Sequence, residues 1–252
     1  MMLYLLLMVV WYVTGVFAQC NLPPSEWCSS RMTAQLCQVE KQCELSGYLP
    51  GVSANPGPVN FTLYYESLCP DCQRFFREQM FKAYKTVGQI MNITLVPYGN
   101  ANEQKDGSKW KFQCQHGPQE CRGNLIETCT IFNEKKVQNY LPFIHCMEVS
   151  GVMPDEAAEK CAKQFPVDLD SILKCANGSK GNALEHHMAL QTDALKPPHQ
   201  YVPWVTINGV HTEKMEKEAE RDLVSLICDT YQGVKPSACS RSTHHTCWRQ
   251  KA

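Results

Sequence analysis

The sequence lacks an excess of charge of either sign, because 24 Lys and Arg residues stand against 25 Asp and Glu residues and leave a formal net charge of −1. Proteins that bind nucleic acids usually carry a basic face or a strongly basic domain. The near balance of charge therefore argues against nucleic acid as a partner.

The chain also lacks a long apolar run. Residues 3–13 are apolar, but a membrane-spanning helix needs about 20 such residues. No Lys or Arg precedes this run, and residues 16–18 fit the small-residue pattern of a signal-peptidase site. We predict that residues 1–18 are a secretory signal peptide and that the chain has no stable membrane span.

A second Cys-x-x-Cys pair, which a zinc site of that kind needs, is missing as well, and Cys114-Gln115-His116 is not zinc-finger spacing. We therefore expect no metal ion. The chain does have 15 cysteines, a number typical of an oxidising compartment. Three Asn-x-Ser/Thr sequons agree with that route, and they predict glycosylation at Asn60, Asn92 and Asn177.

Cysteine, glycine and proline divide the chain into segments. Residues 19–45 hold four cysteines and are similar to the short saposin A-type module, although an ordinary disulfide-stapled prosegment fits equally well. Residues 46–58 are rich in Gly and Pro and are predicted to be a linker. We expect the main domain at residues 59–233, and a C-terminal extension or prosegment at residues 234–252, where no apolar period is found.

The central feature is a pair of cysteines between a strand and a helix. Alternating apolar residues at 59–65 predict a β-strand, and the apolar spacing after Cys72 predicts a helix. Cys69 and Cys72 thus occupy the position of the redox dithiol in a thioredoxin-like fold. The helix N-terminus would stabilise a Cys69 thiolate, and Asp71 would oppose it. A structural disulfide and, more remotely, a zinc knuckle are the other interpretations of the pair.

The pattern further along completes such a fold. Residues 91–97 alternate as in a second strand, a polar turn region follows at 99–107, and residues 114–195 are predicted to be helical. Pro203 precedes a β-rich run. In a thioredoxin-like fold it would be a cis-proline facing the dithiol, and without that context a trans proline at a strand start. An Asn-Gly turn and a helix at 216–231 close the domain. We predict an α/β, thioredoxin-like fold with a helical, disulfide-stapled insertion.

Residues 114–129 read Cys-Gln-His-Gly-x-x-Glu-Cys-x-x-Asn-x-x-x-x-Cys. Together with the Cys69/Cys72 pair and Tyr201-Val-Pro-Trp-Val-Thr, this signature resembles the gamma-interferon-inducible lysosomal thiol reductase family, over roughly residue 59 to the C-terminus. The resemblance implies a glycosylated precursor that is trimmed in endosomes and lysosomes. It also implies reduction of disulfide bonds in endocytosed proteins at acidic pH, in support of antigen processing. Secretion and a disulfide-linked dimer of the precursor are further expectations.

Within the signature, we predict that Cys114, Cys121 and Cys129 staple the insertion to the core and take no direct part in catalysis. His116 is either a proton donor near the dithiol or, as we favour, a hydrogen-bonded structural histidine.

The predicted reaction is thiol–disulfide exchange, in which Cys69 attacks a disulfide of a protein substrate and Cys72 resolves the mixed disulfide. It needs no bound cofactor, but a small thiol such as cysteine must reduce the enzyme again. In acid the attack is favoured by a lowered pKa of Cys69. Two alternatives stay open at this point: an oxidase or isomerase on the same fold, and a disulfide-stapled secreted binding protein without catalysis.

Overall fold

The computed structural model describes residues 20–45 and 57–241 of the 252-residue chain. The predicted signal peptide at residues 1–18 and most of the predicted linker lie outside these residues. Within the described segments, no helix has both the length and the apolarity needed to cross a bilayer.

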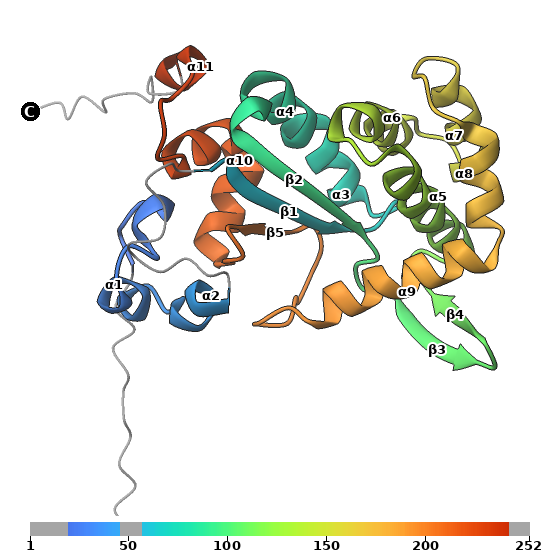
Figure 1. Ribbon diagram of the computed structural model, residues 1–252, viewed down its shortest axis with the longest axis horizontal. Coiled ribbons are helices and arrows are strands. Elements are labelled where there is room, and N and C mark those ends of the chain that lie inside the picture. Colours follow the sequence, from blue (N-terminus) through green and yellow to red (C-terminus); the bar gives the residue numbers. More distant parts are fainter. Residues whose placement is uncertain (1–19, 46–56, 242–252) are drawn as a thin grey trace, which may run out of the picture.

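A three-stranded sheet lies at the centre of the molecule (Figure 1). Its middle strand, β1 (Val59–Tyr65), pairs in parallel with β2 (Met91–Pro97) and antiparallel with β5 (Trp204–Ile207). The side chains of Phe61 and Leu63 are fully buried, which explains the alternation seen in the sequence. The predicted strand–helix–strand start of the domain is confirmed.

A helical segment begins at the dithiol and leads from β1 to β2. It consists of α3 (Pro70–Phe75), a π-helical turn (Phe76–Met80) and α4 (Phe81–Val87). Pro70 suits the first turn, where a backbone N–H would have no partner within the helix. The apolar face of the segment is buried; its fully or nearly fully buried members are Phe75, Phe76, Met80, Ala83 and Val87. This burial fixes the start of the helix, and with it the dithiol, against the sheet.

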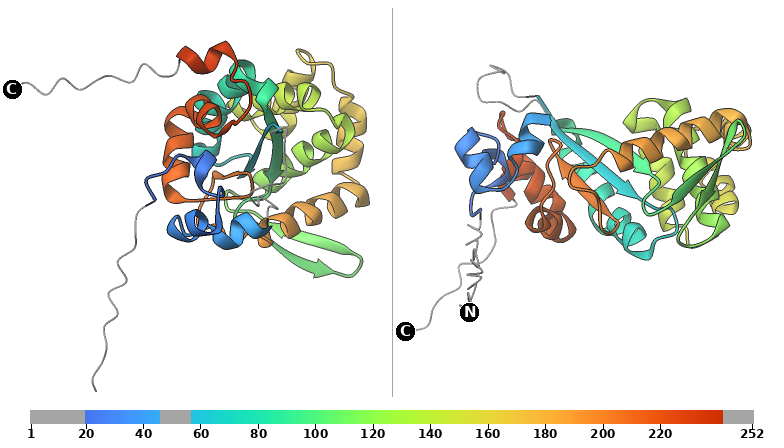
Figure 2. Two further views of the ribbon diagram at one scale, coloured as in Figure 1. Left: turned by 60° about the vertical axis from the view of Figure 1, so that its left-hand side comes forward. Right: turned by 90° about the horizontal axis from the view of Figure 1, so that it is seen from below.

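Five helices form the predicted insertion, on the side of the sheet away from residues 20–45 (Figures 1 and 2). They are α5 (Pro118–Glu134), α6 (Val137–Val149), α7 (Pro154–Ala162), α8 (Leu169–Ala176) and α9 (Ser179–Asp193). The Cys129–Cys175 disulfide joins α5 to α8, and the Cys146–Cys161 disulfide joins α6 to α7. The helical insertion with disulfide staples is thus confirmed.

The disulfide partners of the signature cysteines differ from the prediction. Cys114 pairs with Cys121, seven residues away at the start of α5, and Cys129 pairs with Cys175. Both bonds stay within the region between β4 and α8, so the prediction that these cysteines tie the insertion to the core was wrong. Helix α5 reaches the core by packing and hydrogen bonds instead.

The prediction of a polar turn region at residues 99–107 was also wrong. The chain forms a hairpin there, with β3 (Asn102–Asp106), β4 (Lys109–Gln113) and a tight turn at Gly107, whose φ is +59°. Strand β3 is polar and mostly exposed, so it has no apolar alternation that could reveal it, whereas Trp110 and Phe112 alternate with polar residues along β4.

The domain closes as predicted after β5. Asn208 and Gly209 both have positive φ, 52° and 76°, which is the backbone of a tight two-residue turn. A β-bridge between Ile207 and Val210 closes this turn, and α10 (Glu213–Thr230) follows. The short helix α11 (Ser237–Arg241) is tied back to α10 by the Cys228–Cys239 disulfide.

The segment at residues 20–45 packs next to α10 (Figure 2). It holds a 3-10 turn (Pro24–Glu26) and two short helices, α1 (Arg31–Leu36) and α2 (Glu40–Leu45). Its two disulfides, Cys20–Cys37 and Cys28–Cys43, are internal to the segment. Trp27 is buried in the same hydrophobic cluster as the main domain, so packing holds the two parts together.

Candidate active site

The two thiols of the dithiol are free and buried, whereas the other cysteines of the described residues form six disulfides. Cys69 is the N-cap residue of α3, and Cys72 lies in the first turn of the same helix. The predicted place of the pair, between a strand and a helix, is therefore confirmed. Cys247 lies outside the described residues.

The two thiols differ in acidity. A hydrogen bond from the Cys72 thiol, the backbone N–H groups of Cys72 and Asp71, and the charge of His116 lower the pKa of Cys69 to about 6, although burial works in the opposite direction. Burial, together with the hydrogen bond to Cys69, raises the pKa of Cys72 well above its usual range. Cys69 is thus equipped to be the thiolate and Cys72 to keep its proton.

Two carboxyl groups of the insertion, Glu127 and Glu148, are buried, and Glu148 acts on the dithiol. Glu127 of α5 accepts a hydrogen bond from the Tyr65 hydroxyl, and Glu148 of α6 is its neighbour. Burial raises the pKa of Glu127 to about 7 and that of Glu148 well above its usual range. The charge of Glu148 in turn raises the pKa of Cys72. Burial therefore favours the protonated form of both carboxyl groups.

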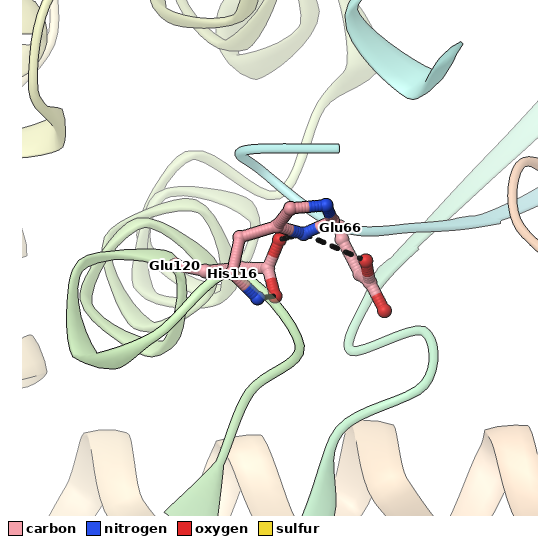
Figure 3. Close-up of side chains that lie close together, drawn as sticks. All are labelled: Glu66, His116 and Glu120. Atoms are coloured by element: carbon pink, nitrogen blue, oxygen red, sulfur yellow. Dashed lines mark hydrogen bonds and ion pairs between the residues drawn. The ribbon is translucent and has the colours of Figure 1, made fainter. Parts of the chain in front are cut away.

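A second group of carboxyls surrounds His116 (Figure 3). The ring Nδ1 of His116 hydrogen-bonds to Glu120 Oε2 and lies 3.4 Å from Glu66 Oε2. Both glutamate side chains are fully buried, while that of His116 is 33% exposed. Glu66 follows β1 and stands three residues before Cys69, so this cluster borders the nucleophile.

The three side chains could also hold a metal ion, since one ligand atom from each lies within 4.8 Å of the others. Hydrogen bonding between the ring and the carboxyl groups already accounts for their arrangement. We therefore assign the cluster to proton and charge chemistry.

The Val202–Pro203 bond is cis, as predicted. Strand β5 runs antiparallel to β1 with Trp204 opposite Tyr64. Pro203 therefore lies at the end of the sheet where β1 leads into the dithiol. The Lys196–Pro197 bond is also cis and had not been predicted.

Comparison with known proteins identifies the family. The family model of gamma interferon inducible lysosomal thiol reductase matches residues 60–165. A gamma-interferon-inducible lysosomal thiol reductase from Carassius auratus is 46% identical over 224 residues, which cover 88% of this chain and 85% of the relative. The chain belongs to this family. The relative of the same name from Mus musculus is 43% identical over 186 residues, or 73% and 72% of the two chains.

Among solved structures, the chain is similar to DsbA from Chlamydia trachomatis, with a TM-score of 0.48 and 16% identity over 68% of this chain and 87% of that one. Family membership and the free dithiol at the start of α3 make the chain a thiol–disulfide oxidoreductase with a thioredoxin-like fold. A binding protein without catalysis, the alternative from another class, is thereby set aside.

The family signature is a set of local contacts around this site. The Asn124 side chain accepts a hydrogen bond from the backbone N–H of Ser67, and the Ser67 hydroxyl donates to the backbone carbonyl of Glu120. Asn100 makes two of these contacts: its side chain donates to Gln115, and its backbone N–H donates to Glu66. The signature thus fixes α5 against the loop that carries the dithiol.

The three predicted glycosylation sites are exposed. Asn60 and Asn92 are paired neighbours on β1 and β2, and Asn92 Nδ2 donates to Asn60 Oδ1 at 2.8 Å. Asn177 caps the C-terminal end of α8 and accepts a hydrogen bond from Arg122. Their modification stays a prediction.

Sequence reasoning missed the buried carboxyl groups of the site, Glu66, Glu120, Glu127 and Glu148. Glutamate normally indicates a solvated surface, so composition and periodicity gave no reason to place these inside. Glu120 had one usable signal, because it stands four residues after His116 at the start of a helix, where two side chains share a face.

Proposed function

We propose that the chain reduces disulfide bonds of protein substrates in an acidic endosomal or lysosomal compartment, with Cys69 as nucleophile and Cys72 as resolving thiol. The observation that carries this proposal is the difference between the two thiols, one with a pKa lowered to about 6 and one with a raised pKa. A thiol of low pKa is the one that attacks, and its partner keeps its proton until a mixed disulfide has formed.

The exchange proceeds in two displacements. The Cys69 thiolate attacks one sulfur of the substrate disulfide, so a bond from Cys69 to the substrate forms and the second substrate sulfur leaves and takes a proton. Cys72 then loses its proton, attacks the Cys69 sulfur and releases the first substrate sulfur as a thiol. The substrate has gained two electrons and two protons, and the enzyme ends with a Cys69–Cys72 disulfide.

Two further groups complete this cycle. Of the buried Glu127 and Glu148 carboxyl groups, only one that is ionised can accept the Cys72 proton, and burial disfavours the ionised form of both in acid. Two molecules of a small thiol such as cysteine would reduce the enzyme disulfide again. No bound cofactor is needed for any of these steps.

A lowered Cys69 pKa supports work in an acidic compartment. At pH 5, a thiol with a pKa of about 6 is about 9% thiolate, against about 0.03% for an unperturbed thiol with a pKa of about 8.5. The thiolate fraction is thus roughly 300-fold higher. A thiolate of lower pKa is also a weaker nucleophile, which slows the attack by about 13-fold at a Brønsted slope near 0.45. The net advantage is about 20-fold.

Replacement of each thiol tests the assignment. Cys69→Ser should abolish turnover of a disulfide-bonded protein at pH 5, and Cys72→Ser should accumulate mixed disulfides that nonreducing gels and mass spectrometry detect. The matched control is Cys228→Ser with Cys239→Ser, which removes a disulfide between α10 and α11 and leaves the dithiol intact. Full reductase activity in Cys69→Ser would overturn the mechanism.

The direction of the reaction is part of the proposal, since an oxidase or isomerase could use the same dithiol. Equilibration of the Cys69–Cys72 couple against a thiol buffer measures its reduction potential. A potential well below that of the substrate disulfides supports a reductase, and a strongly oxidising one supports the alternative.

The cellular setting is proposed from the names of the relatives, which are lysosomal thiol reductases, and from the three exposed sequons. We expect the glycosylated chain in lysosomes, where it would prepare antigens, with part of the precursor secreted. Fractionation followed by deglycosylation tests this. A disulfide-linked dimer of the precursor would appear at twice the mass on nonreducing gels.

A further inference from the structure

His116 is held in place from several sides. Its backbone N–H donates to Glu120 Oε1 at 2.9 Å, and its ring nitrogen binds the other oxygen of the same carboxyl group. The Cys114–Cys121 disulfide brackets this segment of the chain. The ring therefore points between the Glu66 and Glu120 carboxyl groups and has little freedom to turn away (Figure 3).

Glu66 is equally fixed. Its Oε1 accepts the backbone N–H of Asn100 at 2.6 Å, and its side chain fills the space beside Gly99, where a Cβ would lie 2.3 Å from Glu66 Cγ. The backbone carbonyl of Glu66 accepts the N–H of Cys69. The carboxyl that faces His116 therefore belongs to the loop that carries the nucleophile.

At acidic pH, His116 is the positively charged group of the cluster next to Cys69. Burial raises the pKa of Glu66 to about 7, so this carboxyl is neutral at pH 5, and burial also raises the pKa of Glu148 and so favours its neutral form. Against partial burial, the hydrogen bond to Glu120 and the charges of Glu120, Glu66 and Cys69 raise the pKa of His116, so the ring is protonated. The other carboxyl group of the cluster, Glu120, hydrogen-bonds to the ring.

The other ionisable residues of the dithiol, Cys72 and Asp71, do not supply a positive charge near the Cys69 sulfur. Cys72 keeps its proton and acts on Cys69 through a hydrogen bond. The Asp71 side chain is 58% exposed and pairs with Arg74 at 2.8 Å.

We propose that His116, held between Glu66 and Glu120, is a positioning residue whose protonated ring stabilises the Cys69 thiolate and so permits the attack in acid. The inference rests on the proposed function of Cys69 as the nucleophile. It assigns to His116 the electrostatic role that a hydrogen-bonded structural histidine would not have.

The arrangement also limits the support to acidic pH. As the pH rises through about 7, Glu66 becomes a carboxylate, and loss of the His116 proton removes the positive charge of the ring; both changes make the surroundings of Cys69 more negative. The help that the cluster gives to the thiolate is then lost, at a pH where a thiol with a pKa of about 6 is ionised without it.

The first test is the rate of Cys69 alkylation by iodoacetamide as a function of pH, with the modified residue assigned by peptide mass spectrometry. The charge of His116 lowers the pKa of Cys69, and a nearby opposite charge shifts a pKa by about 1–3 units. Because the ring is partly exposed, we expect about the lower end of this range. His116→Gln should slow alkylation at pH 5 by about three- to tenfold and change it by less than about twofold at pH 8.

The chain offers a matched control. His186 of α9 pairs with Glu103 through Nδ1 at 2.6 Å and is similarly exposed, yet it belongs to the β3–β4 side of the molecule. His186→Gln should leave the alkylation profile unchanged. An equal loss of rate at every pH in His116→Gln, or the same loss in His186→Gln, would contradict the electrostatic role.

A second test needs no change at His116. Coupling between two sites is reciprocal, so a thiolate that is stabilised by the imidazolium must raise the pKa of His116 by the same amount. NMR titration of the ring should give a lower His116 pKa in the oxidised protein than in the reduced protein, with His186 unchanged. Equal His116 pKa values in the two states would overturn the inference.

The outcomes separate this inference from the proposed function. Loss of turnover in Cys69→Ser with unchanged alkylation in His116→Gln would leave the reductase mechanism standing and remove the role of His116. Retained turnover in Cys69→Ser would remove the mechanism itself.

Discussion

Asp71 lies between the two cysteines, and the sequence predicts that its charge opposes the Cys69 thiolate. The structure indicates a weaker effect. Its carboxylate is mostly exposed and forms an ion pair with Arg74, while its backbone N–H supports the Cys69 sulfur. An exposed charge that is already paired acts weakly on its neighbours, because water and the partner screen it. The opposition between Asp71 and the thiolate should therefore be small.

We predict that Asp71→Asn lowers the pKa of Cys69 by a few tenths of a unit and speeds its alkylation at pH 5 by up to about twofold. Arg74→Gln leaves the Asp71 charge without its partner and should shift the pKa slightly the other way. Alkylation rate against pH measures both. A higher Cys69 pKa in Asp71→Asn would show that the carboxylate does not oppose the thiolate.

Among single residues, the sequence predicted those whose residue type is uncommon at their position in a fold. Two cysteines at a strand–helix junction and a proline before a β-rich run have few interpretations, so Cys69, Cys72 and Pro203 could be named. Glu66 and Glu148 could not, because a glutamate in a sequence indicates a solvated position unless the fold shows what buries it. Their chemistry depends on elements far apart in the chain.

Helix α5 sets the geometry of the dithiol loop at the scale of elements. Gly123 lies where the helix touches this loop, and a Cβ there would lie 2.2 Å from Ser67 Oγ and 2.7 Å from Ser67 Cβ. The absence of a side chain allows the two hydrogen bonds between Ser67 and α5. Close packing, and not only the signature disulfides, therefore places α5.

We predict that Gly123→Ala lowers the free energy of unfolding by about 1–3 kcal/mol, because the added methyl group forces α5 away from the loop. The loss should exceed the gain of up to about 1 kcal/mol that alanine brings to a helix interior. Gly57→Ala is the control, since a Cβ there meets nothing within 4 Å. Urea denaturation compares the two, and a stabilised Gly123→Ala would refute the close contact.

Elements with an apolar stripe were predictable, and elements without one were not. The stripe of Phe143 and Met147 gave α6, and Asp168 gave the start of α8, where its side chain accepts the Ser171 N–H. The β3–β4 hairpin was missed because β3 is polar throughout, and the alternation of Trp110 and Phe112 along β4 was not used. Its position depends on contacts with α9, which local sequence does not encode.

For the molecule as a whole, the disulfides and the predicted domain boundaries do not coincide. Within the described residues, no disulfide joins residues 20–45 to the main domain, whose contact with them is packing and hydrogen bonds such as Gln232 to the Ser25 carbonyl. At the other end, the Cys228–Cys239 disulfide crosses the predicted boundary between residues 233 and 234. A cut at each place should therefore have different consequences.

We predict that maturation cleaves the chain within residues 46–58 and near residue 233, and that the two fragments separate differently. Under denaturing, nonreducing conditions the N-terminal fragment should come away at once, because its two disulfides are internal. The C-terminal fragment should remain attached through Cys228–Cys239 until a reductant is added. Mass spectrometry of protein from lysosomes, with and without reduction, measures both. Release of the C-terminal fragment without reductant would show that the cut lies beyond Cys239 or that this disulfide is open, and intact termini would contradict the cleavage itself.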